Sequence, residues 1–252
     1  GRRLALGAIG LVAAALVVAA TAPGAAPADE GGVVRGVVRV GGAVVFAGTP
    51  PEPRSIDMSA DPYCVEANPE PGLERPVAVG PEGGLANVVV FVQEGAPASS
   101  GTSASGGERA GEAVLDQSGC RYRPHVLTLR TGQTLVIRNS DGTLHNVHAH
   151  TTVNRGFNVG QPIRGIESRR SFPLAERPIA VRCDIHGWMK SYLLVFDHPF
   201  FAVTAEAGSF ALPVLPPGEY VIEAWHETLG SENRRVTVRA GEDTRLDFTF
   251  GG

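Results

Sequence analysis

The chain has 252 residues and a formal net charge of −4 at pH 7, with acidic and basic residues interspersed. It has neither the basic stripe of a nucleic-acid-binding protein nor an acidic tail, so we expect no nucleic-acid partner. Its length suggests one or two domains.

Residues 1–28 have the pattern of a secretory signal peptide. Two arginines precede an apolar run at residues 4–20, and an Ala-Pro-Ala sequence ends the segment. An uncleaved membrane anchor is the alternative, because the run nearly reaches the roughly 20 residues of a spanning helix. The small residues of the run and the cleavage-like site favour removal. No later segment is apolar enough to span a membrane, so we expect a periplasmic or secreted protein.

The rest of the chain predicts an all-β fold built from sandwiches. Short runs rich in Val, Ile, Leu, Thr and Phe recur between turn residues, and several alternate apolar with polar positions. The 32 glycines and 19 prolines are typical of turn-rich sandwiches, and no long stretch has a helical period. Strands are expected at 32–40, 87–92, 125–130, 134–139, 179–183, 192–196, 201–205, 218–225, 234–240 and 245–250.

Two stretches lack a strand pattern. Residues 94–113 are rich in Gly, Ser and Ala, which bury too little surface to fold, and predict a flexible linker. Residues 49–81 are rich in proline and turn residues and are expected to lie irregularly on the surface. Three blocks remain, at residues 31–93, 114–197 and 198–252.

The chain has 3 cysteines, an odd number. In an exported protein at least one is then free, shared between chains or used for chemistry. Cys183 belongs to the motif described next, and we predict that Cys64 and Cys120 form a disulfide. Closing that loop would stabilise the fold by roughly 4 kcal/mol in the chain-entropy model. Two separately buried thiols are the alternative.

The stretch CDIHGWM, at residues 183–189, places Cys183, His186 and Met189 in a short turn between two expected strands. A thiolate, an imidazole and a weak thioether are most of the ligand set of a blue-copper electron-transfer site. Such a site needs a second imidazole, which should come from a distant strand. The alternative is a buried structural thiol, a surface histidine and a core methionine.

Upstream, an expected strand ends in a polar turn that is followed by His145, in the stretch TLVIRNSDGTLHNVH. With CDIHGWM, this pattern makes residues 114–197 resemble a cupredoxin with the short Cys-x2-His-x2-Met loop of amicyanin-like members. The resemblance implies a Greek-key sandwich that binds one copper ion as Cu(I) or Cu(II). It also implies that Asn146 ties the two ligand loops together by hydrogen bonds. The matching positions are Asn139, Asp141, His145, Asn146, Val147, Cys183, His186 and Met189. The implied ligands are His145, Cys183 and His186, with Met189 axial.

The remaining aromatic and histidine side chains near these motifs have weaker signals. In an extended strand, His145 points to the face opposite His148 and His150. We therefore expect these two to be solvated or hydrogen-bonded, with a second metal site as the alternative. His125 is interpreted as structural. Trp188 is expected to shield the copper site from water.

Residues 198–252 carry SFALPVLPPGEY, which resembles the carboxypeptidase regulatory-like module, a transthyretin-like β-sandwich. The strands that normally open this module lie far upstream, at 32–40 and 85–92. We therefore predict that 31–93 and 198–252 close one split sandwich into which the 114–197 unit is inserted. Two independent β regions are the alternative. No catalytic set accompanies this module.

The cupredoxin resemblance implies an exported type 1 copper protein that carries single electrons between redox partners and is not an enzyme. We expect a redox protein to dock near His186, at an exposed imidazole edge beside Ile185 and Trp188. One alternative is a non-redox copper-binding or surface-interaction module. Another is an enzyme with an open copper position, an option supported by His148 and His150.

Overall fold

The computed structural model describes residues 1, 34–40, 50–70, 72–80, 83–97 and 111–251. The predicted signal peptide at 1–28 and most of the predicted linker at 94–113 lie outside the described residues, apart from Gly1 and the linker's two ends. Within the described part, strands dominate and the one helix is α1 (Pro62–Ala67), so the all-β prediction is confirmed. No helix of this part combines the length and the hydrophobicity that a membrane crossing requires.

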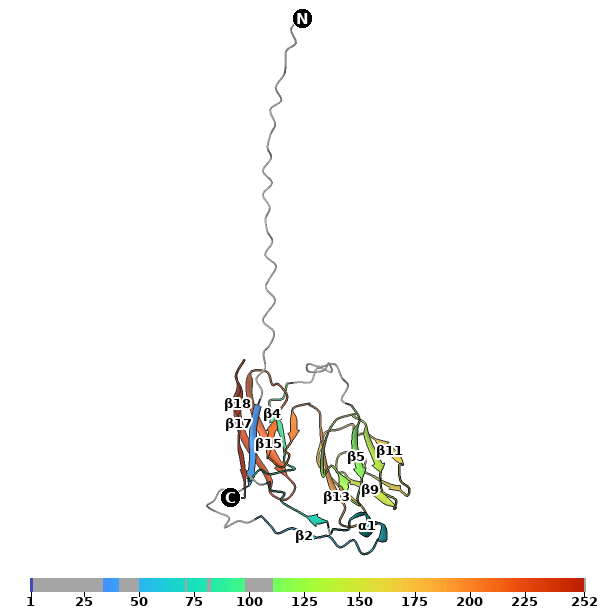
Figure 1. Ribbon diagram of the computed structural model, residues 1–252. Helices are drawn as coiled ribbons and strands as arrows, with labels where there is room; N and C mark the ends of the chain where they lie inside the picture. The colour runs from blue at the N-terminus through green and yellow to red at the C-terminus, as the bar shows by residue number, and fades with distance from the viewer. Residues whose placement is uncertain (2–33, 41–49, 71, 81–82, 98–110, 252) are drawn as a thin grey trace.

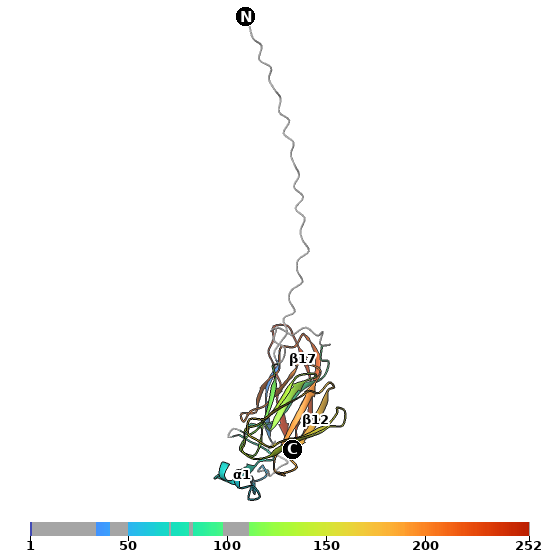
Figure 2. The same cartoon turned by 90° about the vertical axis from the view of Figure 1, so that its right-hand side faces the viewer.

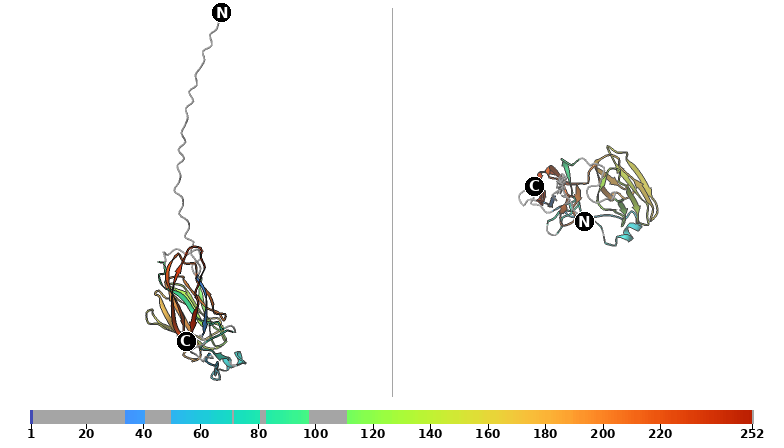
Figure 3. Two further views of the ribbon diagram at one scale, coloured as in Figure 1. Left: turned by 90° about the vertical axis from the view of Figure 1, so that its left-hand side faces the viewer. Right: turned by 90° about the horizontal axis from the view of Figure 1, so that it is seen from above.

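The strands form two lobes that lie side by side in Figure 1 and in the right view of Figure 3. The flanking lobe combines strands from both ends of the chain in two sheets, ordered β15-β1-β18, with β19 also on β1, and β14-β4-β16-β17. Its strands are β1 (Val34–Val40), β4 (Val89–Glu94), β14 (Phe201–Val203), β15 (Ser209–Ala211), β16 (Gly218–His226), β17 (Gly230–Val238), β18 (Thr244–Arg245) and β19 (Phe248–Phe250).

The central lobe is a sandwich of sheets β10-β9-β12-β13-β7 and β11-β8-β5-β6. Strands that are distant in sequence are neighbours in these sheets, as the long connections of a Greek key require. Inward side chains of both sheets, such as Ile137 and Val181, meet in one core. The strands are β5 (Ala113–Gln117), β6 (Tyr122–Arg123), β7 (Val126–Arg130), β8 (Leu135–Asn139), β9 (His145–His150), β10 (Phe157–Gln161), β11 (Glu167–Arg170), β12 (Glu176–Arg182) and β13 (Lys190–Phe196).

Strands β4 and β13 hold the two lobes together because each is buried on both faces. In β4, Val90 packs into the core of the flanking lobe, whereas Phe91 points into the junction between the lobes. In β13, Leu193 packs into the central core and Phe196 into the same junction. The Phe91 and Phe196 rings lie 5.0 Å apart. This apolar junction packs the two lobes directly against each other.

The segment around α1 lies against the central lobe, at its lower end in Figures 1 and 2. Asp61 caps α1 by accepting a hydrogen bond from the Tyr63 backbone, with Pro62 as the first helical residue. Cys64 and Cys120 form a disulfide, which confirms the predicted pairing. The expected irregular segment 49–81 thus contains a helix, and also the short strands β2 (Arg54–Ser55) and β3 (Leu73–Glu74).

Glu176, at the start of β12, closes the turn between β9 and β10. Its buried carboxylate accepts backbone hydrogen bonds from Thr152, from Val153 at 3.1 Å and from Asn154 at 2.8 Å. Burial alone would raise the pKa of Glu176, but the hydrogen bonds from Thr152 and Asn154 outweigh it and lower this pKa to about 2. The charged carboxylate therefore stabilises the turn.

Because the pKa of Glu176 is lowered from 4.5 to about 2 by folding, its contribution to stability is complete above pH 4.5 and is lost as the pH falls towards 2. We expect Glu176→Gln to lower the free energy of unfolding at pH 7 by about 1–2 kcal/mol. The free energy of unfolding should also fall less steeply in this variant as the pH is lowered. Urea unfolding at a series of pH values measures both effects, with the exposed Glu206→Gln as the control. An unchanged acid dependence in Glu176→Gln would contradict this role.

Candidate metal centre

Pairing between β9 and β12 brings the two sequence motifs together. His145 is the first residue of β9, and Cys183 directly follows β12, which pairs with β9 through Arg182 and His148. The turn that follows is closed by hydrogen bonds from the Met189 backbone to His186 at 2.8 Å and from the Cys183 backbone to Met189 at 3.3 Å.

All four predicted ligands are buried, at 0% exposure for His145, 3% for Cys183, 2% for His186 and 1% for Met189. The Met189 side chain belongs to the same buried cluster as Cys183. The structure therefore brings His145, Cys183 and His186 together, with donor atoms within 4.8 Å of one another. Their ligation of a metal stays a prediction.

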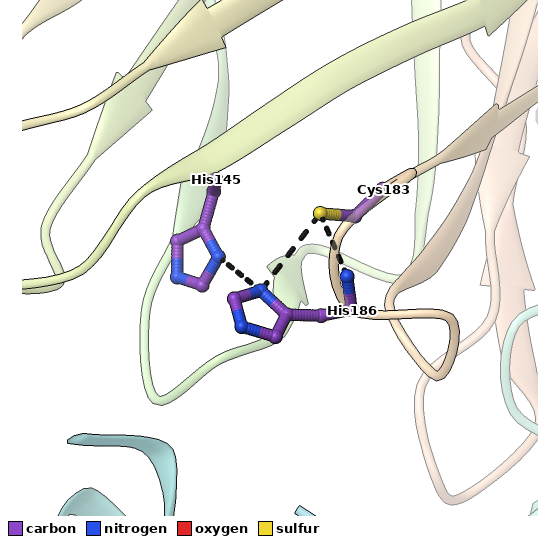
Figure 4. A group of neighbouring side chains, drawn as sticks. All are labelled: His145, Cys183 and His186. Atoms are coloured by element: carbon purple, nitrogen blue, oxygen red, sulfur yellow. Dashed lines mark hydrogen bonds between the residues drawn. The ribbon is translucent and has the colours of Figure 1, made fainter. Parts of the chain in front are cut away.

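Three donor atoms converge in this pocket (Figure 4). The Nδ1 atoms of His145 and His186 lie 2.9 Å apart, and the Cys183 Sγ lies 3.9 Å from the His186 Nδ1. Two atoms that each bind one ion at about 2.0–2.3 Å are separated by no more than roughly 4.5 Å. Both separations therefore fit a single shared metal ion.

Two carboxylates hold the opposite edges of the imidazoles. The His145 Nε2 lies 2.9 Å from the Asp141 carboxylate, and the His186 Nε2 lies 3.0 Å from the Asp61 carboxylate. When each Nε2–H donates to its carboxylate, each Nδ1 carries a lone pair. These two lone pairs point at each other across 2.9 Å and repel unless a proton or a metal ion lies between them. The carboxylates thus create a place for a cation.

The pKa values of Cys183 and His186 shift towards the forms that bind metals, and that of His145 shifts the other way. Burial lowers the pKa of His145, but hydrogen bonds with Asp141 and Cys183 outweigh it and raise this pKa to about 9. Burial raises the pKa of the Cys183 thiol, but hydrogen bonds from His145 and from nearby backbone N–H groups lower it below its usual value. Burial lowers the pKa of His186. These shifts favour the Cys183 thiolate and a neutral His186 imidazole, as metal binding requires, whereas His145 keeps a proton at neutral pH that an incoming metal ion would displace.

Both carboxylates are themselves fixed. Asp141 accepts hydrogen bonds from the backbones of Gly119 and Cys120, each at 2.8 Å. Asp61 accepts one from the Thr143 hydroxyl at 2.8 Å, in addition to its capping bond in α1. Cys120 is disulfide-bonded to Cys64, which lies inside α1. One covalent bridge therefore fastens together the two segments that orient the imidazoles.

Asn146 connects the loops on the other side of the pocket. Its side-chain oxygen accepts hydrogen bonds from the Cys183 thiol at 3.2 Å and from the Asp184 backbone at 2.8 Å. Its side-chain nitrogen donates to the Asp184 carboxylate at 2.9 Å. The buried Asn139 holds the preceding turn by donating to the Thr143 carbonyl at 2.9 Å. Asn146 on β9 thus forms hydrogen bonds to the loop that carries Cys183, as the predicted role in connecting the two ligand loops requires.

The expected exposed edge at His186 is absent. Its imidazole is buried because Asp61 and the disulfide cover it, with the Cys64 Sγ 3.9 Å from the His186 Nε2. The half-buried Trp188 ring packs beside it, with ring centroids 5.0 Å apart. Ile185 is 48% exposed and offers an apolar contact next to the ligands in sequence. Docking of a redox protein near this turn stays a prediction.

Sequence reasoning assigned no role to Asp61 or Asp141. Asp141 matched the cupredoxin-like pattern, so a signal for its position existed. Asp61 lies in the segment that was expected to be irregular, and no local pattern connects it to His186. His125 packs against Tyr192 and pairs with Glu227 of the flanking lobe, as a structural residue would. The other two groups of possible metal ligands include Cys64 or Cys120, whose sulfurs are already bonded to each other.

Comparisons with known proteins identify no family for this chain. No family model and no curated protein matches it. A copper-containing nitrite reductase from Thermus scotoductus aligns at 20% identity and a TM-score of 0.33, over 40% of this chain and 26% of that one. A Cu(I) amicyanin mutant aligns at 22% identity and a TM-score of 0.31, over 34% of this chain and 83% of that one. An oxidized amicyanin mutant aligns at 19% identity and a TM-score of 0.31, over 42% of this chain and 98% of that one. At these scores the alignments do not establish a shared function.

The carboxylate of Asp61 should strengthen metal binding by fixing the His186 tautomer. We expect Asp61→Asn to weaken Cu(II) binding about tenfold and Asp61→Ala to weaken it up to about 100-fold. Competition against a chelator at pH 7 measures the affinities. Asp57→Asn is the matched control, because its exposed carboxylate lies in the same segment and accepts hydrogen bonds from Ser59, not from a histidine. Wild-type affinity in both Asp61 variants would refute the positioning role.

Proposed function

We propose that this protein is an exported mononuclear copper protein that carries single electrons between redox partners. The observation that carries the proposal is the convergence of two imidazole Nδ1 atoms and one thiol sulfur in a buried pocket. Two imidazoles and a thiolate, with Met189 as a weak axial candidate, are the donor set typical of blue-copper sites. A copper ion bound there would supply the Cu(I)/Cu(II) couple.

The rigidity of the donors supports electron transfer over other copper chemistry. His145 and His186 are each held at Nε2 by a carboxylate, and the Cys183 sulfur accepts a hydrogen bond from the His186 backbone at 3.3 Å, which a thiolate keeps. Donors whose positions are fixed in advance need little rearrangement when the charge on the metal changes. The same burial disfavours copper delivery, because an ion must leave a delivery site easily. We therefore favour a carrier over a storage or delivery protein.

The disulfide supports export. Disulfides persist in oxidising compartments and are rare in the cytosol, and Cys64 and Cys120 form one. Together with the signal-like pattern of residues 1–28, this favours a periplasmic or secreted protein.

We further propose that the flanking lobe is a transthyretin-like module split by the central lobe. Pairing of β1 with β15, β18 and β19, and of β4 with β14 and β16, supports this division. Within the predicted range 31–93, however, Asp61 and Cys64 contact the central lobe. The α1 segment is therefore better grouped with the metal centre, and the flanking lobe is left with a packing or partner-binding role.

Addition of one equivalent of Cu(II) to the purified protein should give an intense blue thiolate-to-copper band and a narrow copper hyperfine splitting in the EPR spectrum. Cys183→Ser should abolish the blue band because it removes the thiolate. Visible and EPR spectroscopy check both results. A pale wild-type spectrum with ordinary tetragonal splitting would mean that Cys183 is not a ligand, and would remove the carrier function.

Replacement of both disulfide cysteines, Cys64→Ser with Cys120→Ser, should lower the stability of the protein and leave its blue colour unchanged. We expect the free energy of unfolding to fall by about 4 kcal/mol, since the closed loop is lost from the unfolded state. The blue band should remain, because neither sulfur is a ligand. Urea unfolding and visible spectra measure the two effects. Loss of the band in a folded double variant would show that the bridge is required to assemble the site.

A further inference from the structure

We propose that His148 and His150 form a second metal site, on the solvent-facing side of β9. Both imidazoles point away from the core, because they alternate along the strand with the buried residues Val147 and Ala149. Their ring centroids lie 4.0 Å apart, and the ring planes are inclined by 31°. Two histidine rings are thus already paired on one face of a rigid strand, where both can reach one ion.

A hollow lies over these rings. It has a volume of about 450 Å³ and is open to solvent. Polar side chains contribute much of its lining, so a hydrated ion could enter without losing contact with hydrogen-bonding groups. The lining includes His148, His150, Thr151, Asn154 and Asn158.

Asp184 fixes the orientation of one of the two rings. Its carboxylate lies 3.1 Å from the His148 Nδ1, so when that nitrogen donates its proton the Nε2 lone pair is free for a metal. Asp184 is in turn held by the side-chain nitrogens of Asn146 at 2.9 Å and Asn158 at 2.6 Å. A carboxylate that orients a histidine in this way is the usual support of a metal-binding imidazole.

The chemistry of the two imidazole donors determines which ions this second site can bind. Neutral imidazoles suit divalent transition ions of borderline softness, and Cu(II) or Zn(II) fits two of them. Two protein ligands leave the other coordination positions to water, so this site would be open, unlike the buried one. The same Asp184 reaches the first site, because Asn146 bonds both to it and to the Cys183 thiol. A hydrogen-bonded bridge therefore joins the two sites.

Zn(II) is the probe because it has no redox chemistry; since the Cys183 site can also bind Zn(II), variants of each site distinguish the two. Calorimetric titration of the full chain with ZnCl₂ should show one equivalent that is lost in the double variant His148→Ala with His150→Ala. Each single variant should weaken that equivalent by at least about tenfold. Cys183→Ser should keep it. His125→Ala, whose ring contacts the flanking lobe, is the matched control and should bind as the wild type does.

Residue-specific NMR of the histidine rings provides a second readout. Signals of His148 and His150 should shift on addition of ZnCl₂, while circular dichroism shows that the variants stay folded. If the double variant binds as many equivalents as the wild type, or if these signals do not move, the second site does not exist. A missing blue band with Cu(II) would instead refute the carrier function and leave this result untouched.

Discussion

Two hydrogen bonds between carboxylates and imidazoles determine what the centre can bind. Asp141 and Asp61 each hold one Nε2, and this turns the two Nδ1 atoms towards each other and towards the Cys183 sulfur. Without these bonds either ring could flip or change tautomer, and the three donors would no longer face a common point. The orientation of the donors therefore depends on residues outside the proposed ligand set.

The rest of the architecture keeps these carboxylates in place. The disulfide fastens α1 to the loop that holds Asp141, so the cap over His186 is covalently attached to the central lobe. Strands β4 and β13 join the lobes through an apolar junction. With His186 covered, the hydrogen-bonded connection to the surface runs from Cys183 through Asn146 to Asp184 and His148.

The sequence predicted the parts of this structure that depend on local patterns. Alternating strands indicated an all-β fold, and the motif around Cys183 left Cys64 and Cys120 as the predicted disulfide pair. The cupredoxin-like motifs implied that His145, Cys183 and His186 converge, and their donor atoms do lie within 4.8 Å of one another, whereas ligation by Met189 stays a prediction. The cap over His186 could not be predicted, because α1 has six residues and its contact with the turn is a tertiary one. Proline-rich composition suggested only an irregular segment there.

The most direct test of the central claim is a crystal structure of the copper-loaded protein, with anomalous diffraction measured at the copper edge. The account predicts one strong peak bonded to the Cys183 Sγ and to the Nδ1 atoms of His145 and His186, with both Nε2 atoms still paired to Asp141 and Asp61. Copper bound through an Nε2 atom, or a peak away from Cys183, would contradict it.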